Sequence, residues 1–231
     1  SMQLLVGTDV TLSSGVTSIT GTDGGASFRP DVNTTYNTYS NGSGTVKFTS
    51  GSDQRLYSTS AAASAYTQFH NLILDKSGGT VQGLTTVGFH IKVGNDLTIT
   101  AGTLDTATTN STAHDLTVTG DTLINGGTLT CNGSTINLRS GGSGSTWGLR
   151  VNSGTFNGGT GTHNIGGVTL RGGSFVWSNG TTTLNGGETS SSASTLYGSG
   201  GTWTNGTGTV VVDTSSTLQW LLYNDDVNVN N

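Results

Sequence analysis

Residues 123–138, Leu-Ile-Asn-Gly-Gly-Thr-Leu-Thr-Cys-Asn-Gly-Ser-Thr-Ile-Asn-Leu, contain the motif that decides the fold. Its central part is a glycine, then Thr or Ser, then a large apolar residue. The motif recurs along the chain, with its apolar residue at Val81, Leu104, Leu129, Phe156, Phe175 and Trp203. Successive copies lie 23, 25, 27, 19 and 28 residues apart. Self-similarity at this spacing is typical of proteins that stack one structural repeat on the next.

Each copy follows a short segment in which apolar and polar residues alternate, such as Leu97-Thr98-Ile99. This period of two is typical of a strand with one buried face. Downstream stands an Asn-Gly or Gly-Gly pair and then a second Thr-rich run, as in residues 205–210. Glycine and asparagine tolerate a positive φ, so such pairs indicate corners. Each repeat is therefore expected to contain short strands separated by corners.

Two arrangements of these strands are possible. Asn-Gly between strands favours antiparallel hairpins, which would give a meander. The recurrence of whole units favours a parallel stack instead. We therefore predict an all-β fold, a right-handed parallel β-helix (β-solenoid) with coils of about 25 residues. The interior is expected to be lined by apolar residues at equivalent positions of the repeat, which are Leu72, Leu74, Leu97, Ile99, Leu104, Leu129, Phe156, Val168, Leu170, Phe175 and Trp203.

The composition agrees with a stacked architecture. Of 231 residues 38 are Gly and one is Pro, while hydrophobic residues make up 31%. A compact globule would have little core at this composition, whereas each coil of a solenoid needs only a thin line of inward side chains. The low fraction of charged residues, 9%, and the regular spacing of large apolar residues argue against disorder.

The whole chain, residues 1–231, is expected to form one elongated domain. Residues 1–40 are irregular enough to predict an N-terminal coil or cap, and residues 41–231 contain the repeats. The chain is expected to be a segment of a longer protein. Residues 218–229 show no polar cap, so the final coil is expected to expose an edge through which chains could associate.

Charge, the length of apolar runs and the single cysteine each limit what the chain can do. The net charge is −5, and the eight Lys and Arg residues are scattered, so we expect no nucleic-acid partner. No apolar run approaches the roughly 18 residues of a membrane span, so we expect no membrane insertion. The single cysteine, Cys131, occupies an inward phase of a predicted strand and is expected to be buried.

A resemblance to known proteins is carried by residues 66–79, YTQFHNLILDKSGG, and residues 96–105, DLTITAGTLD. These segments resemble the repeats of large secreted bacterial surface proteins, of the adhesin and autotransporter-passenger type, which fold as right-handed parallel β-helices. The resemblance extends over most of residues 40–212. It implies an extracellular, cell-surface location, a structural or adhesive role, and surface glycans or neighbouring domains as partners. Similar repeats occur in viral tail spikes and fibres, so a glycan-binding tail-spike segment is an alternative.

The sequence contains no phosphate-binding loop, nucleophile elbow or metal-binding helix motif. The Gly-rich stretches lack the lysine and the following helix of a phosphate loop. We therefore expect no enzyme activity, no cofactor and no catalytic or metal-binding residue. Carboxylates on adjacent coils could pair as in a polysaccharide-cleaving β-helix, which is another alternative. More often such carboxylates cap turns. The candidates are Asp75, Asp96, Asp105, Asp115, Asp121 and Glu188.

The four histidines form a second candidate group. His70, His90, His114 and His163 precede the apolar residue of the next motif by 11, 14, 15 and 12 residues, so they could occupy a similar sector of successive coils. A metal site would need two or more of them within reach of one ion. Because the spacing varies, we expect solvated histidines beside strand starts instead.

Threonines two residues apart form a third group. Residues i and i+2 of a strand face the same way, so stacking would align their side chains. Ice-binding solenoids resemble this pattern, which gives an ice-binding Thr-rich solenoid as a further alternative, although Thr also suits exposed strand positions in general. The pairs are Thr98/Thr100, Thr117/Thr119, Thr128/Thr130, Thr160/Thr162, Thr181/Thr183, Thr202/Thr204 and Thr207/Thr209.

Overall fold

A computed structural model describes residues 2–3, 10–21, 27–29, 39–40, 42–56, 66–83, 90–108, 112–138, 148–185 and 195–213. All regular elements in these ranges are strands. They are β1 (Met2–Gln3), β2 (Val10–Thr11), β3 (Val16–Ile19), β4 (Phe28–Arg29), β5 (Tyr39–Ser40), β6 (Thr45–Phe48), β7 (Gln54–Leu56), β8 (Tyr66–Phe69), β9 (Asn71–Gly83), β10 (His90–Val93), β11 (Leu97–Thr108), β12 (Leu116–Val118), β13 (Thr122–Thr130), β14 (Ile136–Leu138), β15 (Leu149–Asn157), β16 (His163–Ile165), β17 (Val168–Leu170), β18 (Ser174–Val176), β19 (Thr181–Leu184), β20 (Leu196–Gly198), β21 (Thr202–Thr204) and β22 (Thr209–Val212).

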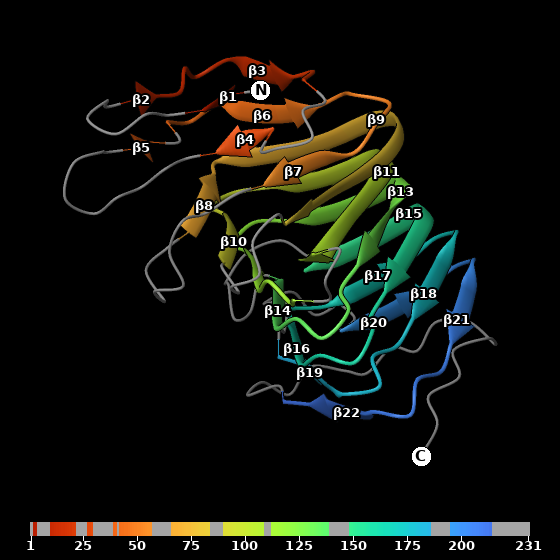
Figure 1. Ribbon diagram of the computed structural model, residues 1–231. Coiled ribbons are helices and arrows are strands. Elements are labelled where there is room, and N and C mark those ends of the chain that lie inside the picture. Colours follow the sequence, from red (N-terminus) through yellow and green to blue (C-terminus); the bar gives the residue numbers. More distant parts are fainter. Residues whose placement is uncertain are drawn as a thin grey trace.

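These strands pair in parallel and form a β-solenoid (Figure 1). One sheet contains 13 strands, a second contains seven, and β2 pairs with β5 separately. The ladder joins Leu72, Leu97, Thr122, Leu149, Val168 and Leu196 in turn, so the five turns between them contain 25, 25, 27, 19 and 28 residues. The predicted parallel stack and coil length are thereby confirmed, and the antiparallel meander is excluded.

The 13-stranded sheet is folded into two faces, because its long strands bend. In β15, Leu149–Val151 pairs with β17, whereas Thr155–Asn157 pairs with β18. We call the part before the bends, together with β3, β6, β17 and β20, the first face. The part after the bends, together with β7, β18 and β21, is the second face. The seven-stranded sheet from β8 to β22 is the third face.

Glycine makes the bend between the first and second faces possible. Gly154 and Gly173, the glycines of two motif copies, have φ values of +85° and +73°. A Cβ atom at Gly154 would lie 2.2 Å from the carbonyl oxygen of Gly127, and one at Gly173 would lie 2.3 Å from that of Gly154. L-residues rarely adopt this backbone conformation, and the stacked corners leave no room for a side chain. The recurring glycine is therefore dictated by the corner.

The interior is a continuous apolar column. All residues predicted to line it are fully buried except Trp203, which is partly buried against the same core. Their register is as expected, since Leu104 pairs with Leu129, and Leu129 with Phe156. Phe156 stacks on Phe175 with ring centroids 4.8 Å apart. Cys131 is buried as predicted.

Two parts of the sequence interpretation concern the chain ends. Strand β3 lies within residues 1–40, where an irregular coil or cap was expected, and it pairs with β6 as a further strand of the first face. The predicted final coil, residues 218–229, lies outside the described ranges. None of the described segments forms a helix of the length and apolarity that a membrane crossing requires.

Candidate functional site

Three of the candidate carboxylates accept hydrogen bonds from the next coil, Asp96 and Asp115 from positions next to strand starts and Asp105 from within β11. Asp96 accepts a hydrogen bond from the backbone N–H of Asp121 through Oδ1, at 2.9 Å. Asp115 accepts one from the N–H of Thr135 in the same way, at 2.8 Å. Asp105 Oδ1 accepts one from Asn132 Nδ2, at 2.6 Å. These side chains thus supply acceptors to donors of the following coil.

The remaining carboxylates form charged contacts or lie outside the description. Asp75 forms an ion pair with Lys47, with 2.6 Å between Oδ2 and Nζ. Asp115 also contacts His90 Nε2 at 2.8 Å. Both contacts join adjacent coils, because Lys47 belongs to β6 and His90 to β10. Glu188 lies outside the described ranges. Four carboxylates of the candidate group, Asp75, Asp96, Asp105 and Asp115, therefore bind a neighbouring coil.

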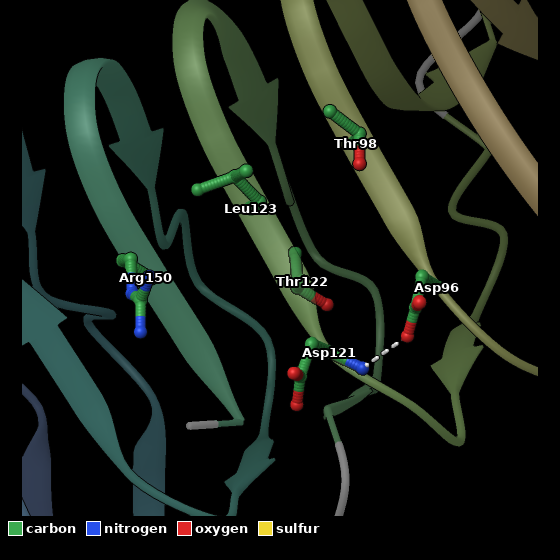
Figure 2. A pocket seen from close by; sticks show the side chains of 6 residues that line it. All are labelled: Asp96, Thr98, Asp121, Thr122, Leu123 and Arg150. Carbon is green, nitrogen blue, oxygen red and sulfur yellow. Dashed lines mark hydrogen bonds between the residues drawn. The ribbon is translucent and has the colours of Figure 1, made fainter. Parts of the chain in front are cut away.

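One pair of these carboxylates lines a pocket on the first face (Figure 2). Asp96 and Asp121, on adjacent coils, line it together with Thr98, Thr122, Leu123 and Arg150. Its volume is about 210 Å³. Burial lowers the pKa of Arg150, as does the nearby Arg171, while Asp121 opposes the shift. The sequence analysis did not identify Arg150 as a pocket residue. It occupies the outward register position at which the two preceding coils carry Leu123 and Thr98.

The pocket offers hydrogen-bonding groups but little else for catalysis. Asp96 accepts hydrogen bonds on both oxygens, from Asp121 N–H and from Asn95 Nδ2. Thr122 is 1% exposed, and its hydroxyl has no partner among the described atoms. The lining contains no aromatic ring on which a sugar could stack. The arrangement thus suits a small polar ligand and places Asp96 in a structural role.

The histidines do not share one sector of the coil. His90 pairs in register with Tyr66, at an outward position beside Asp115, whereas His163 pairs with Ile136 in an inward rank. His70 follows β8 and is partly exposed. Within the described ranges, no three His, Cys, Asp or Glu side chains are grouped closely enough to hold a metal ion.

The expectation of solvated histidines is wrong for His114 and His163, because both are 0% exposed. Burial lowers the pKa of His114 to about 4, against an opposing effect of Asp115. Burial likewise lowers the pKa of His163 to about 4, against an opposing effect of the Gly158 backbone, and neither ring nitrogen has a hydrogen-bond partner among the described atoms. His163 packs edge-on against Phe156, with ring centroids 5.8 Å apart. The alternation in which Ile165 faces inward could have identified His163 as a core residue.

Lys76 is a second buried group that sequence reasoning missed. It is 1% exposed, and its ammonium donates hydrogen bonds to the carbonyl oxygens of Ser50 and Ser52 and to Gln54 Oε1, each at 2.8 Å. Burial lowers the pKa of Lys76, while Asp53 opposes the shift. The three donors are matched by three acceptors, so Lys76 joins two coils within the corner. Its inward phase after Leu74 was the available signal.

The threonine pairs are distributed over all three faces, so they do not form one array. Thr128/Thr130 and Thr202/Thr204 lie on the second face, Thr181/Thr183 lies on the third, and Thr98 lies on the first. A regular rank nevertheless exists, formed by the Thr or Ser of the glycine motif. It comprises Thr80, Thr103, Thr128, Thr155, Ser174 and Thr202, which pair consecutively.

Comparison with known proteins adds no family to this description. No family model, no curated protein and no solved structure matches the chain.

Proposed function

We propose that the chain is a non-enzymatic structural segment of an extracellular surface protein, which acts as a rigid β-helical stalk or binding surface. The observation that carries the proposal is the use of the carboxylates. Asp96, Asp105 and Asp115 accept hydrogen bonds from adjacent coils, and Asp75 pairs with Lys47 of the preceding one. Enzymes that use acid–base chemistry often rely on carboxylates as the acid or base. In this chain the same type of group holds neighbouring coils together, which supports a structural role.

Rigidity is supported by the backbone. Parallel ladders connect the first face from β3 to β20, so each coil is held by its neighbours on both sides. Corner glycines bring successive backbones into direct contact, which leaves little room for bending between coils. The resemblance of residues 66–79 and 96–105 to bacterial surface repeats supports the extracellular location.

The stalk role is tested by a distance measurement along the stack. Fluorophores are attached at Ser18→Cys on β3 and Thr209→Cys on β22, both at exposed positions, while the native Cys131 is buried. Single-molecule energy transfer should give one narrow distance distribution that does not change between low and moderate denaturant. A broad distribution in native buffer would show a flexible chain and contradict the stalk.

The absence of catalysis is tested separately. The chain is incubated with a panel of bacterial and plant polysaccharides, and new reducing ends are measured. We expect none above the level of a heat-denatured sample. Reducing ends that disappear in the Asp96→Asn/Asp121→Asn double variant would make the first-face pocket an active site and overturn this part of the proposal.

A further inference from the structure

The second face carries a regular array of hydroxyl groups. One rank comprises Thr80, Thr103, Thr128, Thr155, Ser174 and Thr202, with one residue on each successive coil, and all are at least partly exposed. A second rank lies two residues further along the same strands. It comprises Gln82, Asp105, Thr130, Asn157, Val176 and Thr204.

The first face provides an internal comparison for this array. Its corresponding rank, in the same coils, comprises Lys47, Ile73, Thr98, Leu123, Arg150, Thr169 and Tyr197, of which Thr169 is fully buried. β-Propensity would favour Thr equally on both faces, since both consist of parallel strands in the middle of a sheet. Only the second face contains a rank with a hydroxyl at every position from β9 to β21. Strand propensity therefore does not account for the rank.

From β9 to β21 the two ranks contain one charged residue, Asp105, and in β7 the neighbouring residue of the second rank is Arg55, which pairs with Gln82. Asp105 Oδ1 accepts hydrogen bonds from Asn132 Nδ2 at 2.6 Å and from the N–H of Ala107 at 2.8 Å. The carboxylate is thus engaged with its own coils. The hydroxyl rank itself is neutral and has no electrostatic attraction for ions or charged polymers, so it suits an uncharged ligand that can form hydrogen bonds at regular intervals.

We propose that the second face binds the surface of ice through an ordered layer of water. Parallel strands place neighbouring hydroxyls of a rank about 4.8 Å apart, and residues i and i+2 about 6.6 Å apart along each strand. The first distance is close to an oxygen repeat on the surfaces of hexagonal ice, and β13 and β21 carry hydroxyls at both i and i+2. Thr is restricted at χ1, so its hydroxyl and methyl groups hold fixed positions at little entropic cost. Because the first rank contains six residues, many weak contacts with the ordered water can form at the same time.

This activity goes beyond the stalk role and does not depend on it. The test compares two variants of β11, Thr103→Lys on the second face and Thr98→Lys on the first face. Each variant and the parent are mixed with an unrelated soluble protein, and ice is grown slowly from the solution. The quantity measured is the ratio of the concentration in ice to that in the remaining liquid. Circular dichroism confirms that the samples are folded.

We expect the parent to be enriched in ice several-fold over the unrelated protein, Thr98→Lys to behave like the parent, and Thr103→Lys to lose most of the enrichment. Should Thr103→Lys fail to fold, Thr128→Val serves instead, because it removes a hydroxyl while keeping the side-chain shape. Exclusion of the parent from ice to the same extent as the unrelated protein would overturn the proposal. Equal loss in the first-face and second-face variants would overturn it as well.

Discussion

Acidification should weaken the fold through His163. Its ring is buried against Phe156, and burial lowers the pKa to about 4, compared with an ordinary value of 6.5. Because the folded pKa is the lower one, the stability contribution is complete above pH 6.5 and is lost as the pH falls toward 4. The full difference corresponds to about 3 kcal/mol, of which about 2 kcal/mol is lost by pH 5. His114 has the same pKa and should contribute similarly.

The assay is urea unfolding followed by tryptophan fluorescence, at pH values from 7.5 to 5. The parent should lose about 4 kcal/mol of unfolding free energy over this range, because two buried histidines must be protonated. His163→Leu, which replaces the ring by an apolar side chain in the same inward rank, should lose only about half as much. His70→Gln, at a partly exposed position, is the control and should behave like the parent. An identical pH dependence in the parent and in His163→Leu would refute the reasoning.

Three further predictions concern stability, measured by chemical denaturation. Leu129→Ala should cost about 2–5 kcal/mol, because Leu104 and Phe156 are held by their ladders and cannot fill the gap; an unchanged unfolding free energy would contradict its burial. Gly154→Ala should cost more than about 2 kcal/mol, because alanine would have to adopt a positive φ and its methyl group would clash with the Gly127 carbonyl oxygen. The control Gly133→Ala should be tolerated, because the nearest atom to its added methyl group lies 3.6 Å away. Lys76→Met should cost about 1–3 kcal/mol for each acceptor that it leaves unpaired, while Lys47→Met, in a partly exposed ion pair, should cost less than about 1 kcal/mol. Similar losses for the two lysine variants would argue against the buried role of Lys76.

The sequence was sufficient for the repeat architecture and much of the core. The alternation before each motif identified Leu72 and Leu97 as inward residues, and the motif glycine marked the corner that Gly154 forms. This works because a stacked coil repeats the same backbone conformation, so its sequence requirements recur at the same phase.

The polar residues of the core were harder to predict, because their chemistry suggests exposure. His163 and Lys76 both occupy inward phases, but residue type favoured the surface interpretation. The partners that make their burial possible are at distant positions, as with Gln54 for Lys76. The hydroxyl rank was also missed as such. Pairs such as Thr98/Thr100 drew attention to residues within a strand, whereas the register joins one Thr of each coil to the next.

The register has a genetic consequence. Leu72 pairs with Leu97, and Leu97 with Thr122, so residues 97–121 form one complete coil that presents the same ladder to the coil on either side. Removing residues 97–121 would join Asp96 to Thr122, and Thr122 would take the place of Leu97 as the register partner of Leu72. Recombination between similar stretches of the coding sequence can therefore shorten or lengthen the chain by whole coils, which makes its length far easier to change in evolution than its cross-section.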